Sequence, residues 1–463
     1  MSAARRRIQT LYRHLPSVPA MDVPSVRGYI TEQAWEGPRQ YVLMVSPVAT
    51  EPICIADHEV HQCKDGTEIC SFHHAPYRGK SVMVNVIRQS YQCSECGATY
   101  CTPLIEIDDV RRMSRDLIQH IRSHPETPSA KMAREVGVSE GSVLHVLSDY
   151  ACEIIARRNG RLPLLLGVDE IYLGSTMRCV ITDLANNRHY RLLVDNTEHT
   201  LKSEFRSYNN RTGVVAIAID MSFHYRQLLE ELFPQAAIVI DLFHVISLAD
   251  QCREAVRKAA VRSAPRSKRP VLRARRGFWE DVGRSENPID GQMPLFGDDL
   301  ITLAKQAHED FCAIFRDAHN AREGAVLSDA WEGALPLELR RYYEPLIRAL
   351  HTYRDEIFAR LDFYLTNGFT EGHNARIRTL HRQMPSARIK TLDHHLIIRA
   401  ELKRLAEERD DSRTPRGDKG CSAALDADGD NAEQFSASAI QSKVPPKTKS
   451  IGQPTDNTER SSA

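Results

Sequence analysis

Residues 164–169 read Leu-Leu-Leu-Gly-Val-Asp, an apolar run that stops at an acid, and the same pattern recurs twice further along the chain. The run at 214–219 stops at Asp220, and the run at 237–240 stops at Asp241. Short apolar runs rich in β-branched side chains are typical of buried strands. We therefore predict a sheet in which three strands each end at an aspartate.

Two further apolar runs, at 178–182 and 190–194, lie between the first of these strands and a predicted helix near residues 201–208. The order is then three strands, helix, strand, helix and strand, followed by an almost wholly helical pattern over residues 245–365. Three strands that can form a meander, followed by alternating helix and strand, describe a mixed sheet covered by helices. This α/β order is that of the ribonuclease-H-like fold, although a generic mixed α/β domain shares it.

Length and composition set wider bounds. The chain has 463 residues, 61 Lys+Arg against 61 Asp+Glu, and 42% hydrophobic residues. At about 150 residues per domain this suggests roughly three domains, and no apolar run approaches the ~20 residues that span a membrane. The start of the chain lacks the apolar run of a secretory signal, which favours a cytoplasmic location. Residues 1–50 are weakly patterned, whereas residues 408–463 contain few large apolar side chains, so we expect a disordered tail there.

Six of the eleven cysteines fall between residues 54 and 101. In a reducing cytoplasm, clustered cysteines indicate metal binding more often than disulfides. Cys93 and Cys96 form a Cys-x2-Cys turn, and two thiolates at that spacing can hold one tetrahedral Zn²⁺. Cys54 with His58 is a candidate for the other half of the site, although other Cys and His residues lie nearby. We expect a structural zinc-binding module over residues 51–104, with a degenerate knuckle of free cysteines as the alternative.

Gly137 separates two short helical patterns, and Ser139 can cap the second of them. A glycine-containing turn between two short helices is what a DNA-binding helix-turn-helix requires, although an ordinary helical hairpin shares the pattern. We expect a helix-turn-helix DNA-binding domain over residues 110–158. Its candidate DNA contacts are Lys131, Arg134, Ser142 and His145.

A fourth acid lies in residues 366–378, which read Thr-Asn-Gly-Phe-Thr-Glu-Gly-His-Asn-Ala-Arg-Ile-Arg. Thr370 can cap a helix that begins at Glu371, and this would hold the carboxylate rigidly in a first helical turn. Arg376 and Arg378 begin a local positive patch. A second basic segment, residues 253–276, has a single acid among its many cations. We interpret it as a surface for the DNA backbone, with a solvated helix face as the alternative.

The stretches at 168–170, 219–222, 241–244 and 367–374, in this order and at this spacing, resemble the motifs of bacterial DDE transposases of the ISL-three insertion-sequence family. The resemblance spans about residues 50–400 and takes in the Cys-x2-Cys turn and the helix-turn-helix. It implies a ribonuclease-H-like catalytic domain over residues 162–400, with the helical insertion before the catalytic glutamate. The zinc region departs from the family, because Cys54 and His58 stand where its first Cys-x2-Cys would fall.

Carried over position by position, the resemblance makes Asp169 the first catalytic aspartate and Glu371 the catalytic glutamate. The second carboxylate of this fold follows the fourth strand, which makes it Asp220 and leaves Asp241 in reserve. The segment from Asp241 to His244 resembles a Cys/Asp-x2-His signature that follows the fifth strand in related transposases, and we treat it as an accessory signature.

The activity implied by the resemblance is cleavage and joining of double-stranded DNA, at the transposon ends and at a target. Carboxylates are the hard oxygen ligands that Mg²⁺ or Mn²⁺ prefers, and a pair of such ions can support phosphoryl transfer. The implied protein works as a homodimer or higher oligomer on DNA, away from membranes, in the nucleoid of a bacterial cytoplasm. Two rival functions stay open. One is a transcription regulator with an inactive core, and the other is a metal-dependent nuclease of the same fold.

Overall fold

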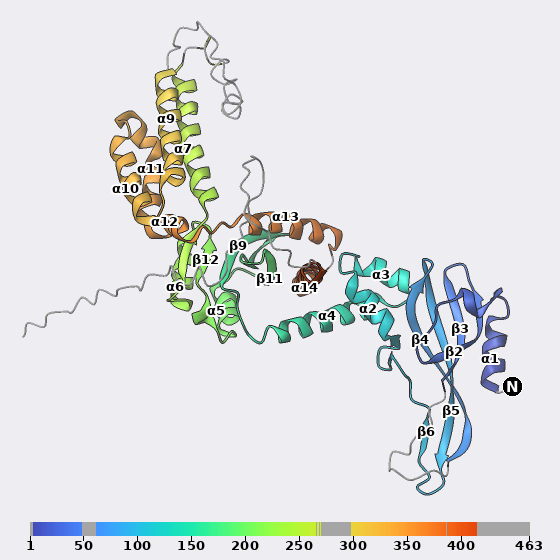
Figure 1. Ribbon diagram of the computed structural model, residues 1–463. Helices are drawn as coiled ribbons and strands as arrows, with labels where there is room; N and C mark the ends of the chain where they lie inside the picture. Colours follow the sequence, from blue (N-terminus) through green and yellow to red (C-terminus); the bar gives the residue numbers. More distant parts are fainter. Residues whose placement is uncertain are drawn as a thin grey trace, which may run out of the picture. The chain divides into compact units, whose positions relative to one another are not determined.

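The computed structural model describes residues 3–48, 62–264, 266–267, 269, 298–385 and 387–413 (Figure 1). The chain divides into two compact units. Within the described residues, the first unit takes in residues 3–163, 167–211 and 368–413, and the second takes in residues 164–166 and 212–367. No helix in these described ranges is long and apolar enough to cross a membrane.

The first unit begins with helix α1 (Ala3–Tyr12) and an eight-stranded sheet. Its strand order is β1-β2-β3-β5-β4-β8-β7, with β6 paired to β5. The strands are β1 (Ser17–Val18), β2 (Tyr29–Glu36), β3 (Gln40–Pro47), β4 (Gln62–Tyr77), β5 (Lys80–Cys93), β6 (Thr99–Cys101), β7 (Ile107–Asp108) and β8 (Met113–Ser114). Because β3 pairs with β5, one sheet spans the boundary that the sequence suggested at residue 51. Alternate apolar residues of β3 and β5, such as Leu43 and Val84, pack into one hydrophobic core.

Three helices follow this sheet: α2 (Arg115–Ser123), α3 (Ser129–Val136) and α4 (Glu140–Arg157). Gly137 ends α3 with φ 80°, a left-handed conformation that favours glycine. The Ser139 side chain caps α4 by accepting a hydrogen bond from the backbone N–H of Ser142. The turn and the cap are thus as predicted from the sequence. Apolar residues of all three helices pack together with Ile397 and Ile398 of a later helix.

A mixed five-stranded sheet has the order β11-β10-β9-β12-β13. The strands are β9 (Leu165–Leu173), β10 (Thr176–Asp183), β11 (Arg188–Leu192), β12 (Ala216–Ile219) and β13 (Ala237–Ile240). β10 and β11 pair antiparallel, and β12 and β13 pair parallel. The division between the units passes through β9, whose first two residues belong to the second unit. The strand positions confirm the predicted apolar runs, but β9 continues past Asp169 to Leu173, so this aspartate lies inside a strand rather than at its end.

Helices α5 (Glu198–Arg206), α13 (Gly368–Gln383) and α14 (Ile389–Arg413) belong to the first unit as well. α13 and α14 pack their apolar residues against β9, β10 and β11, and Ile377 and Leu380 are completely or almost completely buried in that contact. Burial of such a side chain contributes about 1.5–3 kcal/mol, so this packing holds α13 on the sheet. α14 extends into the predicted tail as far as Arg413, where Arg404 pairs with Glu401 and Glu408 one turn away on either side. Residues 414–463 lie outside the described part.

The second unit carries β12, α6 (Phe223–Leu232) and β13, and the part of it that the structure describes continues with five helices. These are α7 (Leu242–Ser263), α9 (Asp298–Asp317), α10 (Ala321–Ala334), α11 (Leu337–Thr352) and α12 (Arg354–Phe363). The described part of residues 245–365 is therefore helical, as the sequence indicated. Trp331 anchors the helices by donating its indole N–H to the carbonyl of Ala307 at 2.8 Å. A Cβ on Gly324 would meet Leu361 at 2.6 Å, so glycine permits the close approach of α10 and α12.

Candidate functional site

Asp169 anchors the first of two groups of acids, which lies within the first unit. Its side chain is buried, with the residue 7% exposed, and such a carboxylate is costly to bury without partners. One carboxylate oxygen accepts the backbone N–H of Glu170 at 2.7 Å, and the other accepts the side-chain amide of Asn374 at 2.7 Å. Asn374 lies on α13, so a residue 205 positions away along the chain orients the Asp169 carboxylate.

Glu371 lies in the first turn of α13 and is half-buried. The sequence suggested that Thr370 caps a helix beginning at Glu371, but α13 begins at Gly368 and Thr370 is inside it. The Thr370 hydroxyl is instead buried within 2.7 Å of the Thr182 hydroxyl on β10. Glu371 precedes Asn374 by three residues, and side chains at that spacing are neighbours on one helix face. We call Asp169, Glu371 and Asn374 the first acidic cluster.

The second acidic cluster consists of Asp220, Asp241 and His244 and lies within the second unit. Asp220 follows β12 and Asp241 follows β13, as predicted from the apolar runs. Asp241 occupies the N-cap position of α7 without a side-chain cap, and His244 lies in the first turn of that helix. Nε2 of His244 is 2.7 Å from Oδ1 of Asp220. The predicted accessory signature therefore contacts the predicted second catalytic aspartate directly.

Asp241 is more deeply placed than the sequence suggested. The residue is 2% exposed, and its Oδ2 is buried without a hydrogen-bond partner among the residues that the structure describes. Burial lowers the pKa of the Arg360 guanidinium, and the negative charge of Asp241 acts against that shift. A buried carboxylate oxygen without a hydrogen bond is a costly arrangement that a bound cation would relieve. The donor set of this cluster, two carboxylates and an imidazole, therefore suits a divalent metal ion.

The candidate zinc ligands are only partly within the described residues. Cys93 and Cys96 lie on a tight turn in which the N–H of Gly97 donates to the carbonyl of Cys93 at 2.9 Å, and Gly97 has φ 70°. Cys54 and His58 fall outside the described part. Two nearby candidates have other contacts, because Arg112 donates to the Cys70 sulfur and the Cys101 thiol donates to Glu68. Among the described side chains of residues 66–104, no three potential ligands converge.

The predicted DNA contacts on α3 and α4 lie at the surface. Lys131, Arg134 and His145 are exposed, and Lys131 has only a long ion pair with Glu135 at 3.8 Å. The Ser142 hydroxyl is within 2.8 Å of the Ser139 hydroxyl, close to the start of α4. On α13, Arg376 and Arg378 are also exposed.

The basic segment at 253–276 is only partly described, and part of it is not a free cationic surface. Arg257 is buried and donates to Glu254 at 2.7 Å, and Arg253 pairs with Asp250 at 2.8 Å. The acids one turn earlier on α7 thus neutralise cations that the sequence suggested for DNA contact. This correction applies to those two arginines, and the residues beyond 269 lie outside the described part.

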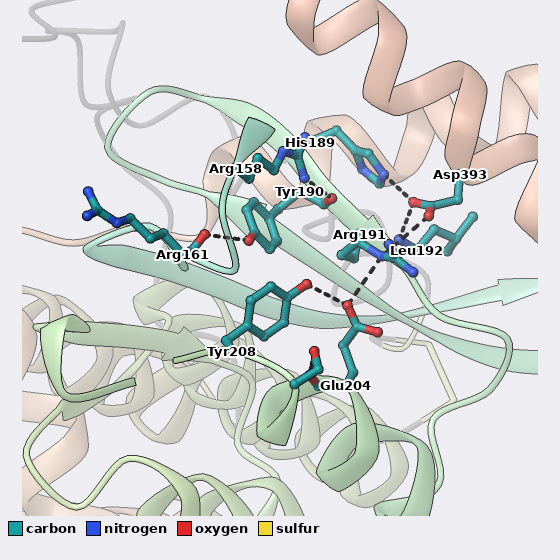
Figure 2. A network of polar contacts seen from close by, with 10 residues as sticks. Arg158, Arg161, His189, Tyr190, Arg191, Leu192, Glu204, Tyr208 and Asp393 are labelled. Atoms are coloured by element: carbon teal, nitrogen blue, oxygen red, sulfur yellow. Dashed lines mark hydrogen bonds and ion pairs between the residues drawn. The ribbon is translucent and has the colours of Figure 1, made fainter. Parts of the chain in front are cut away.

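Sequence reasoning missed a buried polar network in the first unit (Figure 2). It joins His189 of β11 to Asp393 of α14, and Arg191 and Glu204 continue it toward Tyr208. His189 and Asp393 lie 204 positions apart, so no local pattern could have connected them. Asn374 lies within the motif at residues 367–374. Its amide, three residues after Glu371, is the one sequence signal that could have indicated its role.

The family comparison agrees with this geometry. Residues 166–384 match the model of a protein family that is described as transposase. The family is that of the ISL-three group of DDE transposases, to which this segment of the chain is similar. The matched range begins inside β9 and ends just after α13, so it contains both acidic clusters and the helices between them. No curated protein matches the chain.

Proposed function

We propose that the protein is the transposase of an insertion sequence, which binds the ends of its element and catalyses metal-dependent DNA cleavage and strand transfer. The observation that carries the proposal is the family match over a segment that contains Asp169, Asp220 and Glu371. The local chemistry supports it, because Asn374 donates to Asp169 at 2.7 Å and His244 lies 2.7 Å from Asp220.

We further propose that the two acidic clusters act together on divalent metal ions, with Asp169, Asp220 and Glu371 as the main ligands. Asp241 and His244 of the accessory signature, the second of which lies beside Asp220, are further candidate ligands. Carboxylate oxygens are the ligands that Mg²⁺ and Mn²⁺ prefer. A pair of such ions, when bound, would supply the activation of an attacking oxygen and the stabilisation of the leaving oxygen of a phosphodiester.

The chain's own residues then have distinct roles. The carboxylates are negatively charged and by themselves would repel a DNA phosphate. Bound cations would remove this repulsion, so the site requires them. Water attacks the phosphorus at the transposon end and the strand leaves with a free 3′-hydroxyl. That hydroxyl then attacks a target phosphodiester, whose own 3′-oxygen leaves. The first step hydrolyses a phosphodiester and leaves a 5′-phosphate opposite the 3′-hydroxyl, and the second exchanges one phosphodiester bond for another. Neither step has a covalent enzyme intermediate, so neither needs a serine or tyrosine nucleophile.

The fold and the recognition modules are proposed on separate grounds. A mixed sheet with the antiparallel pair β10 and β11 and the parallel pair β12 and β13, with α6 between β12 and β13 in the chain, supports the ribonuclease-H-like fold. The turn at Gly137 and the exposed Lys131, Arg134 and His145 support a DNA-binding helix-turn-helix in α3 and α4. The turn that carries Cys93 and Cys96 supports a zinc knuckle, to which Cys54 and His58 would contribute.

A strand-transfer assay tests the proposal. The full-length protein is incubated with Mg²⁺, a labelled duplex that carries the DNA flanking its own gene, and a supercoiled target plasmid. Joined products at the transposon end are expected. Cleavage without joining would identify a nuclease instead, and end binding without cleavage would identify a DNA-binding regulator. An assembly of two or more protomers on paired ends is expected in the same mixture.

A further inference from the structure

Three short contacts attach the beginning of α13 to three neighbouring strands. Thr370 meets Thr182 on β10 at 2.7 Å, Asn374 meets Asp169 on β9 at 2.7 Å, and Nε2 of His373 lies 2.9 Å from Nδ1 of His189 on β11. All three contacts come from five consecutive residues of one helix. Since successive residues are about 100° apart around a helix, contacts from His373 and Asn374 to different strands fix the rotation of α13 as well as its position.

The contact to β11 is the outer end of a buried chain of polar groups. Nε2 of His189 lies 2.9 Å from Oδ1 of Asp393 on α14, and the same oxygen accepts the backbone N–H of Leu192 at 2.7 Å (Figure 2). His373, His189 and Asp393 are 7%, 3% and 2% exposed. Polar groups buried this deeply are strongly ordered when every partner is satisfied.

The direction of each hydrogen bond in this chain can be worked out. Burial acts to raise the pKa of Asp393, but the hydrogen bond from His189 and the charge of Arg191 outweigh it and hold that pKa below its usual value. Asp393 therefore only accepts, so the Nε2 of His189 carries the proton. Burial lowers the pKa of His189 and keeps it neutral, which leaves its Nδ1 as an acceptor. His373 must then donate from Nε2, and the chain runs from His373 to His189 to Asp393.

Charged neighbours hold Asp393, which is the last residue in this series of hydrogen bonds. Nε of Arg191 lies 3.4 Å from Oδ2 of Asp393 and 3.3 Å from Glu204, and the Tyr208 hydroxyl donates to Glu204 at 2.6 Å. Asp393 also joins α14 to β11 through the N–H of Leu192. Asp393 is thus held between α14 and β11. It fixes His189, so His373 donates to an imidazole that is itself held in place.

We propose that the His373–His189–Asp393 chain is a positioning device, which sets the rotation of α13 so that Asn374 donates to Asp169 and Glu371 faces the same edge. The inference rests on the proposed function, because it assigns the device to the metal-binding carboxylates. Apolar packing of Ile377 and Leu380 keeps α13 on the sheet but allows small rotations and shifts. Directional hydrogen bonds remove that freedom. His373 is accordingly a positioning residue and does not touch DNA or metal itself.

Two amide variants of His373 provide a matched test. In His373→Gln the side chain still reaches His189 and can donate to it, whereas in His373→Asn the amide is too short. His373→Leu removes the donor and keeps an apolar side chain of similar size. We expect the Asn and Leu variants to bind end DNA normally but to cleave it about 10–100-fold more slowly, the usual loss when a group that orients metal ligands is removed. Both should need more Mg²⁺ for half-maximal cleavage, and the Gln variant should recover most of the rate.

Amide hydrogen exchange provides a readout that does not depend on activity. Peptides from α13 should exchange faster in the Asn and Leu variants of the full-length protein than in the Gln variant and the wild type. If the Leu variant does not fold, the comparison of Gln with Asn decides the matter. Equal cleavage and equal exchange in all variants would overturn the inference. A wild-type protein that never cleaves DNA would refute the proposed function, while the exchange data would still decide whether the chain positions α13.

Discussion

The side-chain amide of Asn374 on α13 donates to Oδ2 of Asp169 on β9 across 2.7 Å. This bond connects two parts of the chain that are separated by the whole helical stretch of the second unit. It also explains how a carboxylate can be buried inside a strand with both oxygens satisfied, since the backbone N–H of Glu170 donates to Oδ1. Metal-ligating carboxylates are generally held by such hydrogen bonds.

Asn374→Ala should therefore impair metal use without impairing DNA binding. The variant frees the Asp169 carboxylate to rotate, so we expect cleavage to slow about 10–100-fold and the Mg²⁺ requirement to rise. Thr379→Ala is the matched control, because Thr379 is exposed on the same helix and its hydroxyl bonds only within that helix, to the carbonyl of Ala375 and the side chain of Arg382 among the described residues. Cleavage rates measured across a Mg²⁺ titration check the prediction. An Asn374→Ala curve that overlays the control would show that the amide does not orient Asp169 in the active protein.

Replacement of Asp220 should lower the cleavage rate more than replacement of Asp241. As a direct ligand, Asp220 should be indispensable, so Asp220→Ala is expected to lose all detectable cleavage at any Mg²⁺ or Mn²⁺ concentration. Asp241→Ala should keep a residual rate, about 10–100-fold below that of the wild type, as befits a supporting group. The buried Oδ2 of Asp241 makes this comparison informative. A metal-bound structure in which Asp241, and not Asp220, coordinates the ion held by Asp169 would reverse the assignment.

Removal of the zinc ligands should weaken recognition of the transposon ends. The double variant Cys93→Ser, Cys96→Ser is expected to lose bound zinc and to unfold locally, because structural zinc supplies folding energy to small modules. Cys152→Ser, which replaces an exposed cysteine on α4, is the control. Metal analysis and end-binding affinity measure the two effects. Purified, well-folded wild-type protein that contains no zinc would disprove the knuckle.

The buried histidines make folding stability sensitive to acid. Burial, the neighbouring His189 and Arg376 lower the pKa of His373 to about 3, whereas an unfolded histidine has a pKa near 6.5. The unfolded chain thus binds the extra proton between these values, so the stabilising effect is complete above about pH 6.5 and falls as the pH drops toward 3. Unfolding free energies measured from pH 8 to pH 5 should decrease less steeply for His373→Gln than for the wild type. Parallel curves would show that His373 is accessible to protons in the native state.

Much of this architecture could be predicted from local patterns, because the forces that set it are local. The runs before Asp220 and Asp241 are apolar on every side chain, and only a buried strand suits such a run. Gly137 likewise indicates the end of one helix, and Ser139 indicates the start of the next. The strand end at Asp169 was placed wrongly, because polar Glu170 interrupts an apolar pattern that resumes at Ile171.

The contacts that orient the acids could not be predicted in the same way. Asn374, His189 and Asp393 acquire their roles only through pairing across about two hundred positions, and tertiary packing decides which polar residues meet. Burial of Asp241 was missed for the same reason. An N-cap aspartate normally caps its own helix with its side chain, and nothing in the sequence shows that this one does not.

The central claim is that Asp169, Asp220 and Glu371 hold metal ions for DNA cleavage and joining. The most direct measurement is single-turnover cleavage and strand transfer by wild-type protein, Asp169→Asn, Asp220→Asn and Glu371→Gln in Mg²⁺, with end-binding affinity determined on the same duplex. These changes remove one charge each with little change in shape, so binding should stay at the wild-type level while cleavage and joining fall below detection. Near-normal strand transfer by any one variant would contradict the claim for that residue.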